Sequence, residues 1–269
     1  MKKWFFALAA VLSLRHTTSG TSTMNAVFLS RFSALGPILP VIRSSIEDVF
    51  LGGQSLATKK LVYIPTASNV LSQVSGKSMG EQRRRQRYEA KQKARLLVSE
   101  LGMEQGSVLE IEDPKLSTFD IKQCLSMADI VYVDGGNTFF LQYHIIKSGF
   151  WEAADPLLRN NELLYVGASA GAIVAGQSIE TAFWKGWDNP NPVGLENHIW
   201  DHVNLRGRGL FEKSLFMHFD KDAHSLLVEE KQKTLSVEGG VYCLRDDACL
   251  FVPTKIELSA AKGGSGVLA

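Results

Sequence analysis

A serine flanked by glycines stands at residues 167–171, where the chain reads GASAG. This G-x-S-x-G pattern directly follows a short apolar run, residues 163–166, and precedes a run of helical composition, residues 172–175. In such a strand–turn–helix the serine lies on a sharp bend, with its hydroxyl exposed at the carboxyl edge of a sheet. The helix that follows directs free N–H groups towards the same point. The pattern therefore predicts that Ser169 is a nucleophile.

A second glycine turn, residues 134–138 (DGGNT), follows another apolar run and opens a helix-like segment. Acyl transfer needs two N–H donors where the oxyanion of the tetrahedral intermediate forms, and a Gly-Gly turn on a neighbouring strand can supply one. We predict Gly136 and Ala170 as these donors, with Gly135 and Asn137 beside the substrate. Glycine turns at helix N-termini also bind phosphate, but neither a G-x-G-x-x-G pattern nor a P-loop lysine accompanies this one. The oxyanion interpretation is therefore favoured.

A serine nucleophile needs a base, and His218 is the best placed of the histidines. It follows the strand-like run 214–217, which would deliver it to the same edge of the sheet. Three other histidines remain rivals for this role: His198, His202 and His224. The spacing His218-x3-Asp222-x-His224 suggests a metal site, but further ligands are lacking, so we expect no metal.

The base in turn needs an acid that fixes its tautomer and stabilises the imidazolium. Asp188 follows the serine at a suitable distance along the chain, and we predict it as this acid. Three other acidic residues remain alternatives: Glu196, Asp201 and Asp220.

The elements that must hold these residues alternate along the chain. Short apolar runs of the buried-strand type occur at residues 25–30, 60–65, 107–111, 130–133 and 163–166. Segments of helical composition lie between them, at residues 81–101, 119–127 and 137–147. Two closing strands are expected within residues 241–253, around the turn residues Asp246 and Asp247, and an irregular tail after Ile256. The alternation predicts an α/β fold, a mostly parallel sheet covered on both faces.

The composition restricts the partners. The net charge is +1, so there is no overall attraction to nucleic acid or to a membrane. The basic cluster at residues 83–95 is interpreted as an exposed helix face, with Leu96, Leu97 and Leu101 turned inward. The three cysteines are too few and too scattered for a disulfide framework, and we expect free thiols. A small peptide is therefore the expected partner, and the sequence leaves the oligomeric state open.

The first 23 residues differ from the rest. Lys2 and Lys3 precede an apolar run that is too short to span a bilayer and has the form of a secretory signal, although no A-x-A cleavage pattern follows. We interpret residues 1–23 as an N-terminal extension with a signal or targeting role, and residues 24–269 as a single α/β domain.

Three ordered segments together resemble the peptidase E and cyanophycinase family of serine peptidases: residues 134–138, residues 167–171 and the pair His218-Phe219. The likeness covers most of the chain after residue 24. It implies a class I glutamine amidotransferase-like (flavodoxin-like) three-layer sandwich and a Ser-His-acid mechanism without cofactor. It places the nucleophile at Ser169, the oxyanion glycine at Gly136 and the base at His218. The stretch between serine and histidine is longer here than in the peptidase E pattern.

The resemblance also implies a substrate. Peptidase E proteins remove N-terminal aspartate from dipeptides, and cyanophycinases release β-Asp-Arg from a β-linked polymer. A pocket for an aspartyl side chain should hold a cation, because a buried carboxylate without a partner is costly. Three cations between serine and histidine are the candidates for this role: Lys185, Arg206 and Arg208. By resemblance the location is cytoplasmic, or the secretory pathway if residues 1–23 are a signal.

Two other functions compete with this one. In an α/β-hydrolase esterase the histidine usually comes far downstream of the serine, whereas here only 49 residues separate Ser169 from His218. An amidotransferase-like binding module without activity would not need the set of Ser169, His218 and Gly136. A serine exopeptidase acting on short peptides is the function that the sequence favours.

Overall fold

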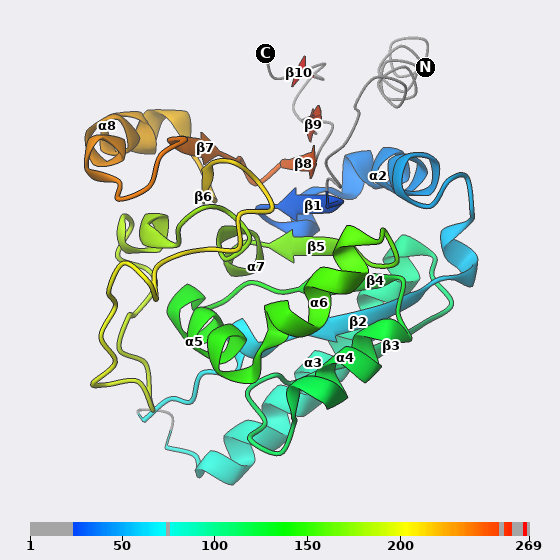
Figure 1. Ribbon diagram of the computed structural model, residues 1–269, viewed down its shortest axis with the longest axis horizontal. Coiled ribbons are helices and arrows are strands. Elements are labelled where there is room, and N and C mark those ends of the chain that lie inside the picture. Colours follow the sequence, from blue (N-terminus) through cyan, green and yellow to red (C-terminus); the bar gives the residue numbers. More distant parts are fainter. Residues whose placement is uncertain (1–23, 74–75, 253–255, 260–265, 268–269) are drawn as a thin grey trace.

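The computed structural model describes residues 24–73, 76–252, 256–259 and 266–267. Its centre is an eight-stranded sheet in the order β10-β9-β8-β1-β5-β4-β2-β3 (Figure 1). Five strands run parallel: β1 (Ala26–Leu29), β2 (Lys60–Ile64), β3 (Gln105–Val108), β4 (Ile130–Val133) and β5 (Leu164–Ala168). Three strands extend the sheet antiparallel beside β1: β8 (Ala248–Val252), β9 (Ile256–Ser259) and β10 (Gly266–Val267). The extension 1–23, with its predicted targeting role, lies outside the described residues.

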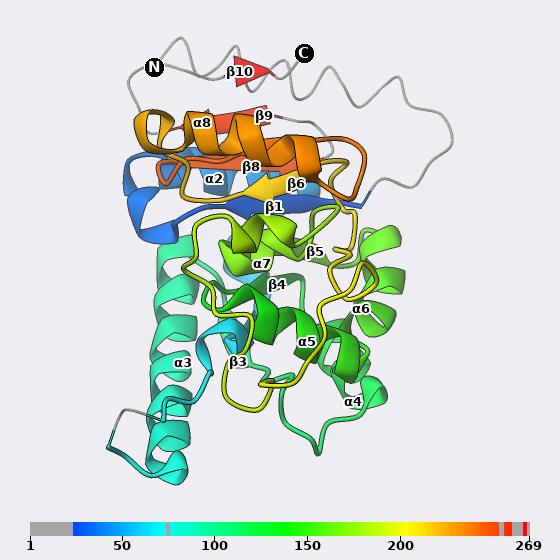
Figure 2. The same ribbon diagram turned by 90° about the vertical axis from the view of Figure 1, so that its left-hand side faces the viewer.

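Helices cover both faces of this sheet. One face packs against α4 (Thr118–Ser126), α5 (Thr138–Ser148), α6 (Phe150–Arg159) and α7 (Ala170–Ile173). The other packs against α2 (Leu39–Ser45) and α3 (Met79–Leu101). Figure 2 shows α3 and the α4–α6 group on opposite sides of the strands. The predicted three-layer α/β fold is therefore confirmed.

The strand sequences explain the two cores. Every residue of β1 (AVFL) and of β4 (IVYV) is buried. Alternate side chains point to opposite faces, so Phe28 and Val131 join the α4–α7 core while Val27 and Tyr132 join the α2–α3 core. Apolar runs without polar alternation are typical of parallel strands covered on both sides.

A second, two-stranded sheet lies beside the main one. Its strands β6 (Ser214–Phe216) and β7 (Val241–Cys243) run parallel and are joined through α8 (Lys221–Lys231), at the upper left of Figure 1. The predicted closing strands within residues 241–253 are β7 and β8, but they belong to different sheets. The chain between them therefore crosses from the small sheet to the large one.

Some sequence predictions were wrong in detail. β3 begins at Gln105 and ends at Val108, earlier than the expected 107–111. The tail after Ile256 was expected to be irregular, but β9 pairs with β8 and β10 pairs with β9. Backbone pairing at the sheet edge, which depends on a neighbour rather than on local composition, explains this difference.

The basic helix α3 mostly fits its interpretation as an exposed face. Leu97 and Leu101 are buried as expected, whereas Leu96 is exposed. Four of its cations pair with acids: Arg83 with Glu112, Arg85 with Glu89, Arg87 with Glu110 and Lys93 with Asp134. The three cysteines form no disulfide, as predicted. Within the part of the chain that the structure describes, no helix is long and apolar enough to cross a bilayer.

Candidate active site

Ser169 lies at the turn between β5 and α7, as its motif predicted. Its backbone has φ 49° and ψ −110°, a conformation that residues other than glycine rarely adopt. Its N–H donates to the Leu29 carbonyl of β1 at 2.9 Å. This turn places the hydroxyl at the carboxyl edge of the sheet, beside the loop that follows β4.

The glycines around Ser169 are required by close backbone contacts. A Cβ on Gly167 would lie 2.6 Å from the carbonyl oxygen of Gly171. A Cβ on Gly171 would overlap the backbone of Val133. Real side chains do not approach a backbone this closely, so the G-x-S-x-G pattern here is a packing requirement between β4, β5 and α7.

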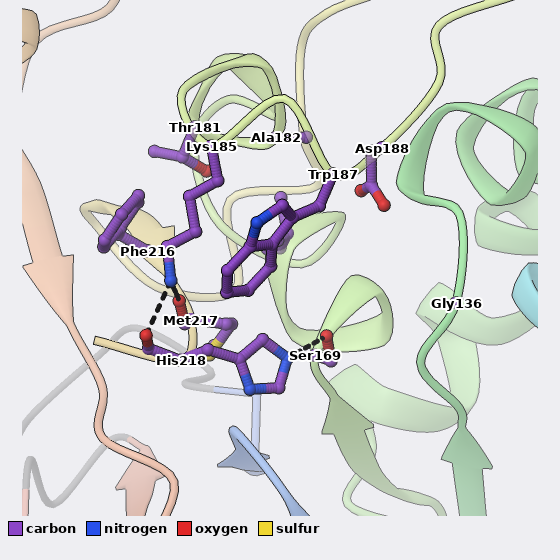
Figure 3. A pocket seen from close by; sticks show the side chains of 11 residues that line it. Gly136, Ser169, Thr181, Ala182, Lys185, Trp187, Asp188, Phe216, Met217 and His218 are labelled. Carbon is purple, nitrogen blue, oxygen red and sulfur yellow. Dashed lines mark hydrogen bonds between the residues drawn. The ribbon is translucent and has the colours of Figure 1, made fainter. Parts of the chain in front are cut away.

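His218 contacts the serine directly. It follows β6, has a positive φ of 54°, and its Nε2 lies 2.8 Å from Ser169 Oγ (Figure 3). Its other ring nitrogen, Nδ1, lies 2.6 Å from Oδ1 of Asp246. With Nδ1 protonated and donating to Asp246, Nε2 is free to accept the serine proton. The order serine–histidine–aspartate matches a nucleophile, base and orienting acid.

Asp246 is also held by two residues that follow β1. The Ser30 hydroxyl donates to Oδ1 of Asp246 at 2.9 Å, and Arg31 Nε lies 2.9 Å from Oδ2. Partial burial acts to raise the pKa of Asp246, but hydrogen bonds from His218 and Ser30, with the Arg31 charge, lower it below its usual value. The carboxylate is therefore kept ionised, as the role of orienting acid requires.

Asp188, the acid expected from sequence, does not contact the histidine. Its Oδ2 accepts a hydrogen bond from the backbone N–H of Thr138 at 3.1 Å, at the start of α5. The correction has a physical reason: the loop that carries Asp188 contacts the N-terminus of α5, while the turn between β7 and β8 brings Asp246 to His218. Burial raises the pKa of Asp188.

The three alternative acids are also placed elsewhere. Their carboxylates accept hydrogen bonds from backbone N–H groups within their own turns: Glu196 from Gly194, Asp201 from Val203 and Asn204, and Asp220 from Asp222 and Ala223. Carboxylates used in this way stabilise loops and helix starts.

The rival histidines have other surroundings. His198 packs edge-on against Tyr143 and Trp200. His224 lies on α8, and its Nδ1 accepts from the backbone N–H of Asp220. His202 lines a separate cavity. Of the four histidines weighed from sequence, the structure brings only His218 to Ser169.

The glycine turn after β4 faces the serine. Gly136 has φ 139°, and a Cβ there would overlap the Ala67 backbone. The turn is fixed by Ser68 Oγ donating to the Gly135 carbonyl at 2.7 Å and by the Asn137 N–H donating to the Ala67 carbonyl at 2.8 Å. Gly136 and Ser169 line one pocket. Ala170, the first residue of α7, has a backbone N–H that the helix itself does not use.

A pocket of about 250 Å³ opens beside Ser169 (Figure 3). Apolar side chains form much of its wall, and two charged groups, Lys185 and Asp188, also face it. Figure 3 shows the Trp187 ring between these two charges, above Ser169 and His218. Trp187 is 65% exposed, so it borders both the pocket and solvent.

Lys185 is the one predicted substrate cation that lines this pocket. Its Nζ donates to the carbonyls of Met217 at 2.8 Å and His218 at 2.6 Å. It also lies 4.3 Å from the ring centre of Trp187 and 4.4 Å from that of Phe216. Burial lowers its pKa to about 8, although the charge of Asp246 acts to raise it.

The other predicted substrate residues are engaged elsewhere. Arg208 pairs with Asp155, and Arg206 lines the separate cavity with Gln177 and Glu238. The Asn137 side chain caps α5 by accepting from the Phe140 N–H, and donates to the Asn189 carbonyl. Among the described residues, no group of three or more His, Cys, Asp or Glu side chains is arranged to hold a metal ion.

A model of peptidase family S51 matches residues 38–255. The chain belongs to peptidase family S51. An uncharacterized peptidase of Listeria innocua is 32% identical over 185 residues, which cover 67% of this chain and 72% of that protein. An uncharacterized peptidase of Listeria monocytogenes is 26% identical over 235 residues, covering 86% of this chain and 95% of that protein.

Solved structures show the same fold. A crystal structure of a candidate peptidase E protein from Listeria monocytogenes matches this S51 chain with a TM-score of 0.56 and 22% identity. That match covers 91% of this chain and 99% of the other. The resemblance to the peptidase E family is therefore confirmed.

Sequence reasoning did not select three residues that the structure places at the site of this S51 peptidase. Asp246 was noted only as a turn residue, and Ser30 and Arg31 were not singled out. A signal for Asp246 was present, since it lies in the turn between the two predicted closing strands, β7 and β8. Nothing local marks Ser30, whose neighbours in space are 188 and 216 residues away along the chain.

Proposed function

We propose that this S51 chain is a serine exopeptidase that removes N-terminal aspartate from short peptides. Ser169 is the nucleophile, His218 the general base and Asp246 the orienting acid. The observation that carries the proposal is the line of contacts from Ser169 Oγ to His218 Nε2 at 2.8 Å and from His218 Nδ1 to Asp246 at 2.6 Å. An activated serine requires a base within hydrogen-bond reach and an acid behind it.

The acylation step follows from this geometry. His218 Nε2 takes the hydroxyl proton as Ser169 Oγ attacks the scissile carbonyl carbon. The resulting oxyanion accepts hydrogen bonds from the N–H groups of Gly136 and Ala170. The imidazolium, stabilised by Asp246, then gives its proton to the leaving amine as the C–N bond breaks.

Deacylation repeats these roles with water as nucleophile. His218 takes a proton from the water, whose oxygen attacks the acyl carbon. Collapse of the second tetrahedral intermediate breaks the bond to Ser169 Oγ, which regains its proton from His218. The products are the N-terminal amino acid and the shortened peptide or free amino acid.

The position of Asp188 supports the proposal that cleavage takes place next to a free N-terminus. Its carboxylate faces the pocket, and the protein supplies it with one backbone donor, the Thr138 N–H. A carboxylate desolvated in a substrate pocket is stabilised by a bound cation. The α-ammonium of the residue on the acyl side of the scissile bond is such a cation, because it is one atom away from the carbonyl that Ser169 attacks. Binding there restricts cleavage to the first peptide bond.

The position of Lys185 supports the proposal that the enzyme prefers substrates with an acidic N-terminal side chain. Two of its three N–H donors bond the Met217 and His218 carbonyls, which leaves one donor for a substrate carboxylate. The aromatic rings of Trp187 and Phe216 flank the ammonium and limit its contact with water. The pocket thus offers an anion site and a cation site on the same side of the serine.

Two measurements test this function. A fluorophosphonate probe should label the wild-type protein, and mass spectrometry should find the label on Ser169. Hydrolysis is then compared for Asp-Leu, Asn-Leu, N-acetyl-Asp-Leu and β-Asp-Arg. We expect Asp-Leu to be cleaved fastest and the acetylated peptide to resist cleavage. An unlabelled protein, or equal kcat/KM for Asp-Leu and Asn-Leu, would contradict the serine mechanism or the aspartyl preference respectively.

Variants assign the two charged groups. Lys185→Met should abolish the preference for Asp-Leu over Asn-Leu, and Asp188→Asn should abolish the preference for a free amino group over an acetylated one. Because each result is a ratio measured within one variant, a general loss of activity does not affect it. Arg206→Ala is the matched control, since Arg206 lies between serine and histidine in the sequence but lines another cavity.

A further inference from the structure

Three consecutive residues at the end of β1 each hold one member of the proposed triad. The Leu29 carbonyl accepts from the Ser169 N–H at 2.9 Å. The Ser30 hydroxyl accepts from the His218 N–H at 2.7 Å. Arg31 Nε lies 2.9 Å from Asp246 Oδ2. This segment precedes residues 38–255, the stretch that matches the family model.

Ser30 makes the most contacts of the three. Besides accepting the His218 N–H, its hydroxyl donates to Asp246 Oδ1 at 2.9 Å and lies 3.2 Å from His218 Nδ1. One hydroxyl therefore bonds the backbone of the base and the side chain of the acid. Ser30 is only 2% exposed, so water does not readily replace these bonds.

The backbone of His218 explains why such support is needed. Its φ of 54° is unfavourable for a histidine, and it persists only when neighbouring groups hold it. Ser30 holds the N–H of this residue, while Lys185 Nζ holds its carbonyl. The ring is thereby fixed between Ser169 and Asp246.

We propose that Ser30 is a positioning residue of the catalytic centre. Its hydroxyl sets the backbone of His218 and, by donating to Asp246 Oδ1, sets the orientation and basicity of that carboxylate. The inference rests on the proposed serine mechanism. Arg31 contributes less, because its side chain is 56% exposed and solvent screens its charge.

The loss of the Ser30 hydroxyl should have two separable effects. Without its acceptor, the His218 N–H is left unpaired, and the ring populates orientations away from Ser169, which lowers kcat. Without its donor, Asp246 becomes more basic and favours the imidazolium. The acidic limb of kcat/KM, where the imidazole becomes protonated, then moves to higher pH.

Four charged groups around the His218 ring also act on its protonation: Asp246, Arg31, Lys185 and Asp188.

The experiment compares Ser30→Ala with Ser214→Ala. Ser214 is a matched control, because its hydroxyl is fully buried on β6, near His218, and makes no hydrogen bond within the described residues. We expect Ser30→Ala to lower kcat by about ten- to hundredfold, with KM changed by less than about threefold, and to shift the acidic limb upward. Ser214→Ala should keep the wild-type profile.

Two further variants separate position from packing. Ser30→Thr retains the hydroxyl and should recover most of the lost kcat and the wild-type acidic limb. Ser30→Cys retains the buried volume with a weaker hydrogen-bonding group and should also lower kcat. It therefore tests the role of the hydroxyl if Ser30→Ala does not fold. A kcat and a pH profile like those of the wild type in Ser30→Ala, or in Ser30→Cys if the alanine variant is unfolded, would overturn the inference.

Labelling by the fluorophosphonate probe distinguishes a failure of the proposed function from a failure of the role assigned to Ser30. If the wild-type protein is not labelled at Ser169, the proposed function fails. If the wild type is labelled, and Ser30→Ala reacts at the same rate across the pH range, only the role of Ser30 fails. Slower labelling of Ser30→Ala, with the acidic limb of its pH profile moved to higher pH, supports both the proposed function and the role of Ser30.

Discussion

The two halves of the site are built in different ways. The serine half, β5 with the turns at Gly136 and Ser169, is fixed by backbone contacts that leave no room for a Cβ at its glycines. The histidine half depends on side chains: His218 is held by Ser30, Lys185 and Asp246, and its acid is 39% exposed. The proposed nucleophile is therefore placed by the main sheet, whereas the proposed base is placed by hydrogen bonds between separate segments. Substitutions should affect the two halves differently.

The largest effect is expected in the serine half. Ser169→Ala should lower kcat by about 10⁶-fold, because the nucleophile and base act as one unit. The fold should be retained, since Ala occupies less space at the same turn. Steady-state hydrolysis of Asp-Leu measures the loss, and thermal unfolding checks the fold. Turnover within tenfold of wild type would exclude Ser169 as the nucleophile.

The comparison between Asp246 and Asp188 gives the next largest effect. Asp246→Asn should lower kcat by up to about 10⁴-fold, because an amide can stabilise the wrong histidine tautomer and does not stabilise the imidazolium. Asp188→Asn should act mainly on KM for substrates with a free amino group. The kcat and KM of both variants on the same peptide decide between them. A greater loss of kcat in Asp188→Asn would return the role of acid to Asp188.

Lys185 gives a smaller, pH-dependent effect. Because burial lowers its pKa to about 8, the ammonium is charged below this pH and loses its charge as the pH rises through it. The ratio of kcat/KM for Asp-Leu to that for Asn-Leu should therefore fall by about tenfold between pH 7 and pH 9.5. A ratio that stays constant over this range would mean that Lys185 does not read the substrate charge.

The smallest effect belongs to Arg31. Its ion pair with Asp246 is exposed, so Arg31→Ala should change kcat by less than about threefold. Added salt should reduce even this difference. A loss of kcat as large as that of Asp246→Asn would show that the histidine half is held mainly by charge rather than by the Ser30 hydroxyl.

The same comparison explains what could be predicted from sequence. The turns at Ser169 and Gly136 could be predicted from the sequence because backbone packing demands glycine at fixed spacing, which leaves a local pattern. The position of His218 could be predicted from the sequence because a strand precedes it and points to the sheet edge. The α/β fold followed from buried strands alternating with helices.

The partner of His218 left no comparable pattern. Asp246 and Asp247 are adjacent turn residues, and only the crossing from β7 to β8 decides that Asp246 reaches the histidine while Asp247 pairs with Arg245. Asp188 was a reasonable choice by spacing along the chain, but spacing does not show that its loop is bound to α5. Contacts between distant segments, such as Ser30 with His218, are set by the tertiary fold alone.

The backbone of Ser169 also bears on how stable the molecule can become. A serine at φ 49° and ψ −110° costs on the order of 1–3 kcal/mol, and the surrounding contacts must outweigh this. A glycine at this position would relieve the cost and raise the melting temperature, but it would remove the proposed nucleophile. If Ser169 is the nucleophile, as proposed, the protein gives up thermal stability at the residue that performs the chemistry, and stabilising substitutions have to be sought away from this turn.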